Sequence, residues 1–146
     1  VIATINDGSL WAKLLRYDAL GYLLGAGSNA GSDTDIDEKG IVQGHAYAIL
    51  DAQEVSSSVR LLKIMNPWGS GEWTGDWSDQ SDKWTRRLKA KLGWSEVDDG
   101  IFFMEFADFV REFRNLYVCR IFPDSWHAVG VPSAWTAAGP FGRRGC

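Results

Sequence analysis

Two short motifs constrain this chain more than any other part of its sequence. They are Gly44-His45-Ala46-Tyr47 and Asn66-Pro67-Trp68-Gly69. The first lies at the start of one strand-like run, residues 43–55, and the second lies at the end of another, residues 59–66. Because an antiparallel hairpin brings the start of its first strand beside the end of its second, the sequence predicts that His45 lies close to Asn66.

The register of this hairpin is compatible with a direct pairing of His45 and Asn66. Such a pairing puts the centre of the turn between Val55 and Ser56, inside the polar segment 53–58. Directly opposed residues point to the same face of a sheet. A shift of one residue or a bulge is also compatible with the sequence, so the register stays open.

An imidazole, an amide and an indole in this order are parts of a nucleophilic site. An imidazolium stabilises a neighbouring thiolate, an Asn oxygen can fix the orientation of the ring, and an indole over their hydrogen bond excludes water. His45, Asn66 and Trp68 are therefore candidate catalytic residues. Taken singly, each has a simpler interpretation: a buried strand histidine, a turn-forming Asn before Pro67, and a core tryptophan. The joint pattern favours the functional interpretation.

No cysteine stands where a thiol would complete this site. We expect Cys119 to be a buried structural thiol, because it alternates with Tyr117 and Ile121 on a strand. Cys146 lies in a Gly- and Arg-rich end, and two distant cysteines indicate neither a disulfide framework nor a Cys-rich zinc site. Residues 1–4 have no signal-peptide pattern and suggest a piece of a longer chain.

Length and composition are those of one ordinary globular domain. A chain of 146 residues can bury a hydrophobic core, and 45% apolar with 23% charged residues is a typical balance. The net charge of −4 argues against a nucleic-acid partner. No apolar run approaches the roughly 20 residues of a membrane span. Eight tryptophans predict a core or cleft rich in large flat side chains.

Periodicity places further elements around the hairpin. We expect helices at 8–20, 81–92 and 105–113 and strands at 22–27, 101–104 and 115–122. Gly21 is the expected end of the first helix and Ser81 the expected cap of the second. The aspartates of residues 28–40 imitate the start of an EF-hand loop. The required Gly and Glu are missing from its sixth and twelfth positions, so the sequence favours a solvated loop.

Further motifs extend the pattern along most of the chain. They are Glu72-Trp73-Thr74-Gly75, Trp77-Ser78-Asp79, Asp99-Gly100-Ile101-Phe102-Phe103-Met104, Asp108-Phe109 and Tyr117-Val118-Cys119. Together with the two hairpin motifs they resemble the second half of a calpain protease core, over roughly residues 9–122. Residues 23–28 and 40–45 are particularly similar to the membrane-anchored calpain of plants and algae.

The resemblance implies a papain-like cysteine endopeptidase whose core is split into two halves around the substrate cleft. The implied fold is α+β: a twisted antiparallel β-sheet with a few flanking helices over residues 1–122, followed by a poorly ordered linker or tail at 123–146. The other, N-terminal half would carry the nucleophilic cysteine, so this half is inactive alone. The implied substrates are intracellular proteins. The implied location is the cytoplasmic side, with no membrane contact from this segment and any tether elsewhere in the parent chain.

The resemblance also implies a calcium ion (Ca²⁺) in this half. The matching ligands are Glu72, Asp79, the carbonyl of Val97 and the side chain of Asp99. Hard oxygen ligands on an irregular loop suit calcium. Ile101 stands where many calpains have another glutamate, which weakens the expected binding. Ordinary loop acids are the equal alternative.

A second hypothesis for the whole segment is non-catalytic. A calpain-like module without a nucleophile would bind protein, peptide or carbohydrate through its tryptophans. A Gln followed a few residues later by Cys at a helix start, upstream of this segment, would favour the peptidase over the binding module.

Overall fold

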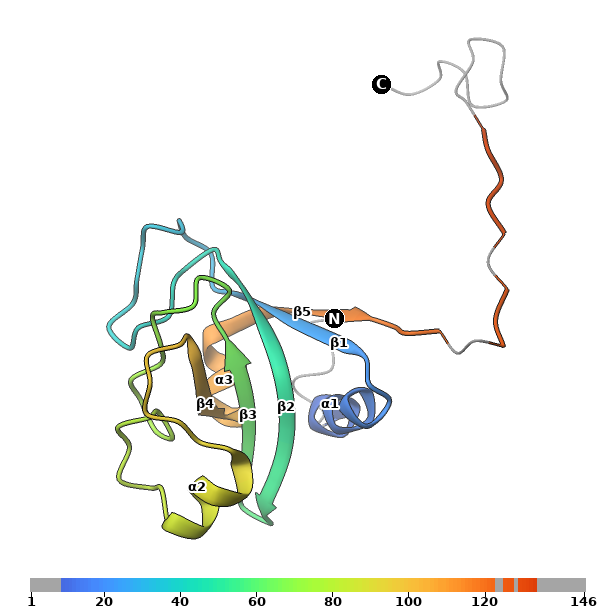
Figure 1. Ribbon diagram of the computed structural model, residues 1–146. Coiled ribbons are helices and arrows are strands. Elements are labelled where there is room, and N and C mark those ends of the chain that lie inside the picture. Colours follow the sequence, from blue (N-terminus) through green and yellow to red (C-terminus); the bar gives the residue numbers. More distant parts are fainter. Residues whose placement is uncertain (1–8, 123–124, 128, 134–146) are drawn as a thin grey trace.

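The computed structural model describes residues 9–122, 125–127 and 129–133 (Figure 1). Within these residues the chain forms three helices and a five-stranded antiparallel sheet, which confirms the expected α+β class. In chain order the elements are α1 Ser9–Ala19, β1 Leu23–Ser28, β2 Ala46–Ser56, β3 Val59–Met65, α2 Arg86–Leu92, β4 Ile101–Glu105, α3 Phe106–Glu112 and β5 Phe113–Cys119.

The strands lie in the order β4-β3-β2-β1-β5, and each neighbouring pair is antiparallel. The hairpin β2–β3 is therefore the centre of the sheet, while the last strand of the chain returns to pair with the first. This return places the ends of β1, β2 and β5 side by side, as Figure 1 shows. The site that the two motifs define lies at this end of the sheet.

The register of the hairpin differs from direct opposition of His45 and Asn66. Ala48 pairs with Met65 and Ser56 with Val59, so the turn lies at residues 57–58, and two bulges separate these pairs. Continuing the register by one residue places position 47 across from Asn66. His45 therefore reaches Asn66 diagonally, a spacing that still allows long side chains to meet on one face.

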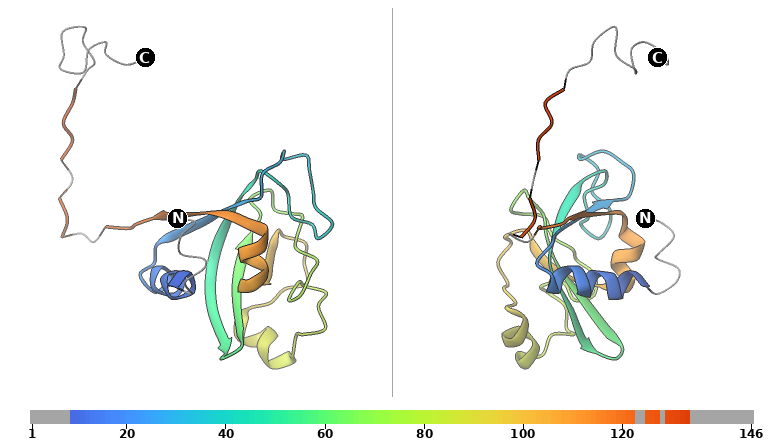
Figure 2. Two further views of the ribbon diagram at one scale, coloured as in Figure 1. Left: turned by 180° about the vertical axis from the view of Figure 1, so that it is seen from behind. Right: turned by 90° about the vertical axis from the view of Figure 1, so that its right-hand side faces the viewer.

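Two hydrophobic clusters cover opposite faces of the sheet. Successive residues of β3 and β4 belong to different clusters. Leu62 and Phe102 pack in the cluster with α1 and α3, whereas Leu61 and Phe103 pack in the cluster near α2. This division follows from the alternation of side chains along a strand. Figure 2 shows α2 on the other side of the sheet from α1 and α3. Burial on both faces makes β3 and β4 a rigid support for the residues that follow β3.

The helix expected at 81–92 is shorter in the structure, and its expected cap is wrong. α2 begins at Arg86, and Thr85 caps it by accepting the amide of Leu88 through its hydroxyl. Tertiary packing explains the difference. Trp84 is buried and donates its indole N–H to the carbonyl of Ser78 at 2.8 Å, and residues 82–83 form a turn instead of a first helical turn.

The end of α1 agrees with the prediction, whereas the burial of Cys119 was wrongly predicted. Gly21 follows α1 with φ of 66° and donates its amide to Asp18, as a helix-ending glycine does. Cys119 is exposed, because β5 is an edge strand whose burial is concentrated at Phe113. Alternation along a strand predicts which residues share a face, but burial requires that this face be covered, and the face of β5 that carries Tyr117 and Cys119 is open.

The described residues include only short pieces of the C-terminal segment. Most of the linker expected at 123–146, including Cys146, lies outside them, and residues 125–127 and 129–133 contain no helix or strand. Among the helices of the described residues, none has the length and apolar character needed to cross a membrane.

Candidate active site

His45 and Asn66 form a hydrogen-bonded pair at one end of the central hairpin. His45 directly precedes β2 and Asn66 directly follows β3, so each is held by the last backbone pairings of its strand. Nε2 of His45 lies 3.0 Å from Oδ1 of Asn66. Asn66 is 0% exposed, which removes water as a competitor for its side-chain oxygen.

The bonds of Asn66 determine which nitrogen of His45 carries the proton. The Nδ2 group of Asn66 donates to the carbonyls of Ser70 at 2.9 Å and Gly71 at 3.2 Å, so its Oδ1 must face the imidazole. Oδ1 also accepts the backbone N–H of Trp68 at 3.2 Å. An oxygen can only accept, so this network assigns the proton to Nε2 and leaves Nδ1 of the neutral ring as the basic nitrogen.

Two aromatic rings contact the imidazole of His45. The ring of Trp68 lies 4.5 Å from that of His45 and is tilted by 45°, with 52% of the residue exposed. Tyr47 packs edge-on at 5.0 Å, and its buried hydroxyl accepts the amide of Val42 at 2.9 Å. Burial raises the pKa of Tyr47, which keeps this hydroxyl protonated. The expected position of Trp68 beside the pair is thus present, while the sequence analysis assigned no role to Tyr47.

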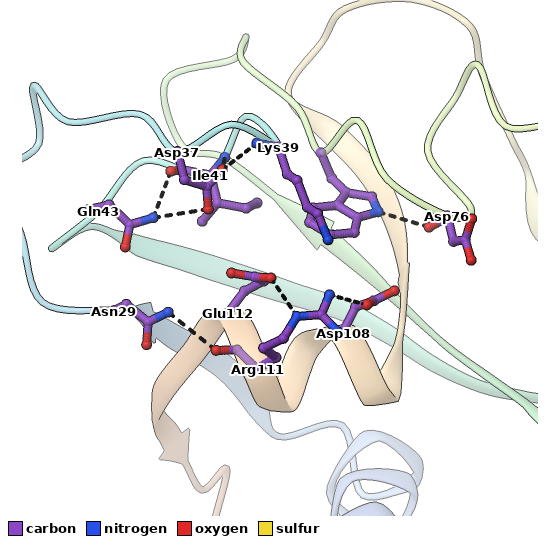
Figure 3. A network of polar contacts seen from close by, with 10 residues as sticks. Asn29, Asp37, Lys39, Ile41, Gln43, Asp76, Asp108, Arg111 and Glu112 are labelled. Atoms are coloured by element: carbon purple, nitrogen blue, oxygen red, sulfur yellow. Dashed lines mark hydrogen bonds and ion pairs between the residues drawn. The ribbon is translucent and has the colours of Figure 1, made fainter.

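The loop before His45 is held by its own hydrogen bonds and by the segment after Asn66. The carboxylate of Asp37 accepts the amides of Lys39 and Ile41 at 2.8 and 2.9 Å, and the side chain of Gln43 donates to the same carboxylate (Figure 3). The ammonium of Lys39 lies 5.2 Å from the ring centre of Trp73. The two loops that flank the pair are therefore packed on one another.

An open hollow of about 330 Å³ adjoins His45 between the loop and the edge of the sheet. Gly27, Tyr117 and Arg114 are among its lining residues, and Nε of Arg114 donates to the side-chain oxygen of Asn29 at 2.9 Å. His45 is half-buried and borders this hollow. A half-buried imidazole at such a position could act as a base on a substrate or on a thiol that another part of the protein supplies.

Four acidic side chains gather beyond the pair. Burial raises the pKa of Asp79 to about 7, and the charge of Glu72, a hydrogen bond with Glu72, and the charges of Asp99 and Glu96 add to the effect. Burial also raises the pKa of Glu72, against the hydrogen bond from the amide of Gly100. Oδ2 of Asp79 is buried and has no hydrogen-bond partner. The cluster therefore contains more negative charge than its own hydrogen bonds stabilise.

The sequence-predicted calcium ligands are only partly assembled. Glu72 and Asp79 are neighbours, and the orphaned oxygen of Asp79 fits a cation-binding group. The carbonyl of Val97, however, accepts the amide of Asp99 at 2.7 Å, and Oδ1 of Asp99 accepts the amide of Ile101 at 2.9 Å. Within the described residues, no group of three or more His, Cys, Asp or Glu side chains is arranged to hold a metal ion. The oxygen donors suit calcium, but of the four expected ligands only the carboxyl groups of Glu72 and Asp79 lie together.

Gly100 connects this acidic loop to the pair. Its amide donates to Oε1 of Glu72 at 2.9 Å, and its carbonyl accepts the amide of Asn66 at 2.8 Å. A Cβ at position 100 would lie 2.9 Å from the carbonyl oxygen of Asn66, and φ is 79°, so only glycine fits without strain. Asp98 adds a second link by accepting the amide of Gly71 at 3.1 Å. The sequence analysis missed both links, because neither follows from spacing.

Cys119 is not placed to serve His45. It pairs with Leu23 at one end of β1, whereas the amide of Ser28, at the other end, donates to the carbonyl of His45. A strand of this length spans roughly 17 Å. A thiol for this imidazole therefore has to come from outside the described residues.

An imidazole oriented by a buried amide at the end of an antiparallel sheet is the histidine–asparagine arrangement that papain-like cysteine proteases use. The chain belongs to the calpain family of cysteine proteases, because the sequence model of "Calpain family cysteine protease" matches residues 2–120.

Curated relatives agree with this family. The chain is 50% identical over 121 residues to the calpain-type cysteine protease DEK1 of Arabidopsis thaliana and 49% identical to ADL1 of Oryza sativa subsp. japonica. Each match covers 82% of this chain and 6% of the relative. The calpain-1 catalytic subunit of Rattus norvegicus is 36% identical over 129 residues, 80% of this chain and 17% of the relative. The chain thus spans a small part of these relatives.

Proposed function

We propose that this chain is the His/Asn half of the catalytic core of a calcium-dependent cysteine endopeptidase, and that it is inactive without the half that carries the cysteine. The hydrogen bond between His45 and Asn66 carries the proposal. It fixes the proton on Nε2 and leaves Nδ1 available to a thiol that approaches from the side away from Asn66. Family membership supports the peptidase class.

In the proposed reaction, Nδ1 of His45 takes the proton of the cysteine thiol, and the thiolate attacks the carbonyl carbon of the scissile peptide bond. The resulting imidazolium then returns the proton to the leaving amine as the C–N bond breaks. In the second step Nδ1 takes a proton from water, hydroxide attacks the acyl group, and the thiolate leaves. Asn66 keeps the ring in plane throughout, and Trp68 covers part of the hydrogen bond.

For calcium we propose the set Glu72, Asp79, the carbonyl of Val97 and Asp99. The charge gathered at Asp79 and its unpartnered oxygen support the site. A bound cation would neutralise these carboxylates, and the chain of Glu72, Gly100 and Asn66 would transmit a shift of the loop to the pair. Calorimetric titration with calcium tests the site, and no heat at millimolar calcium would refute it.

The binding-module hypothesis has less support from the tryptophans. Trp11, Trp73, Trp77 and Trp84 are buried in the two hydrophobic clusters and cannot contact a ligand. Trp68 is half exposed, but it lies against His45. The proposed partners remain protein substrates and the Cys-bearing half, without nucleic acid. We further propose that the parent acts on the cytoplasmic side, with any membrane tether outside this segment.

Cleavage of a fluorogenic peptide by the chain joined to the upstream, Cys-bearing part of its parent tests the proposal. We expect calcium-stimulated cleavage there and none by this chain alone. The His45→Ala variant should lose activity by at least about 100-fold. His127→Ala, which changes the other histidine of the chain, is the matched control and should retain activity. Equal activity of His45→Ala and the wild type would refute the assignment.

A further inference from the structure

Ser28 makes an unusual set of contacts with the backbone of His45. The amide of Ser28 donates to the carbonyl of His45 at 3.0 Å, which continues the β1–β2 pairing by one residue beyond Gly27 and Ala46. The returning bond does not use the backbone. The amide of His45 donates instead to the hydroxyl Oγ of Ser28 at 2.9 Å, and this hydroxyl lies 3.1 Å from the carbonyl of His45, to which it donates.

The fold explains why a side chain replaces the backbone here. The pairing of β1 with β5 shifts register between Gly27 and Ser28, and the chain then leaves the sheet for the loop. The carbonyl of Ser28 is therefore not the acceptor of the His45 amide. A serine hydroxyl has one hydrogen to donate and lone pairs to accept, so it can satisfy both backbone groups of one extended residue. Ser28 is 6% exposed, which limits competition from water.

We propose that Ser28 is a positioning residue for His45, whose hydroxyl holds the backbone of the base so that its imidazole points at Asn66. That His45 is a base rests on the proposed function, but the contacts between Ser28 and His45 do not depend on that function. The neighbouring amide of Gly44 donates to the carbonyl of Asn29 at 2.7 Å, so residues 44 and 45 are both tied to the end of β1. Among the described residues, no other side chain hydrogen-bonds to the backbone of His45, and its ring is held only by Asn66 and by aromatic contacts.

The alternative is that Ser28 merely satisfies polar groups at a strand end. The two roles differ in what happens to the ring. If Ser28 positions the base, loss of its hydroxyl frees the backbone of His45, and the hydrogen bond from Nε2 to Asn66 weakens. If its role is only structural, stability falls while the ring keeps its bond.

Nuclear magnetic resonance of the full 146-residue chain distinguishes these roles. At about pH 8.5, where an ordinary imidazole is neutral, we expect the wild-type chain to show a slowly exchanging Nε2–H proton and a protected His45 amide. In Ser28→Ala the Nε2–H signal should be lost to exchange with water. Exchange of the His45 amide should accelerate about tenfold, the effect of one lost hydrogen bond, while Leu62 in β3 stays protected.

Ser78→Ala is the matched control, because Ser78 is equally buried and its carbonyl, which the variant keeps, receives the indole of Trp84. It should leave both His45 signals unchanged. If Ser28→Ala does not fold, Ser28→Cys replaces it, since a thiol is close in size but a weak hydrogen-bonding group, and the same changes are expected.

An unprotected His45 amide in the wild type, or an unchanged Nε2–H signal in a folded Ser28 variant, would overturn the proposal. Neither result would affect the proposed peptidase, which depends on the His45→Ala experiment. Conversely, an inactive joined core with intact His45 signals would reject the peptidase and leave the role of Ser28 standing.

Discussion

The side-chain amide of Asn66 faces His45 with its oxygen and the backbone of residues 70 and 71 with its nitrogen. One buried group thereby orients the imidazole and closes the turn that follows β3. The turn is tied in addition to Glu72 and Asp98 through Gly100 and Gly71. The His45–Asn66 pair and the acidic loop are consequently one hydrogen-bonded unit.

Asn66→Ala should reduce both stability and activity. The carbonyls of Ser70 and Gly71 lose their donor, so we expect the free energy of unfolding to fall by about 1–3 kcal/mol in urea denaturation. Activity of the joined core should fall about 100-fold, because the imidazole loses its orientation. Asn115→Ala, at an exposed position of β5, is the control and should stay within about 0.5 kcal/mol of wild type. Undiminished activity of the Asn66 variant would contradict the role given to this amide.

Tyr47→Phe should destabilise the chain through the loop rather than through the sheet. The change keeps the buried ring and removes the acceptor of the Val42 amide, which costs about 1–3 kcal/mol. Tyr117→Phe is the same change on the exposed side of β5 and should be nearly neutral. Thermal unfolding of both variants measures the difference, and equal midpoints would show that the Val42 bond adds nothing to stability.

The stability of the calcium-free chain should fall as the pH rises from about 4 to about 7. The folded pKa of Asp79 is about 7, above the ordinary value of 3.8, so the unfolded chain loses this proton first and ionisation favours unfolding across that interval. The effect is complete above pH 7. In Asp79→Asn the slope should flatten, as urea denaturation at several pH values will show.

Bound calcium should reverse the loss of stability that ionisation of Asp79 causes. If the ion binds there, it stabilises the wild type above pH 7 and has little effect on Asp79→Asn. Asp76→Asn is the control, because Asp76 lies in the same loop but is exposed and paired with Lys83 at 2.7 Å. An identical calcium response of Asp79→Asn and the wild type would show that calcium does not bind at Asp79.

Gly44→Ala should destabilise the folded chain more than backbone strain alone explains. Position 44 has φ of 61°, and a Cβ there would lie 2.3 Å from the carbonyl oxygen of Gly31. Gly21→Ala separates the two effects, since its φ is 66° and nothing lies within 4 Å of an added Cβ. We expect Gly21→Ala to cost about 1–2 kcal/mol and Gly44→Ala clearly more, as measured by thermal unfolding.

Much of the fold followed from periodicity in the sequence. The central hairpin, α1 with its terminal Gly21 and the short α3 all lie close to their expected positions, because local alternation and capping decide them. The errors occurred where packing outweighed a local pattern. Trp84 is buried in the core, so α2 begins later in the chain than expected. Cys119 is exposed because one face of β5 is uncovered.

The sequence by itself determined the chemistry of the site: an imidazole, an amide and an indole at hairpin spacing. Their residue types and order along two strands are enough to predict that they meet. Only the tertiary structure decided how the imidazole is held. The diagonal contact to Asn66, the tie from Ser28 to the backbone of His45 and the link through Gly100 join segments far apart in the chain. Such contacts depend on bulges, register shifts and loop packing, which leave no periodic signal in a single sequence.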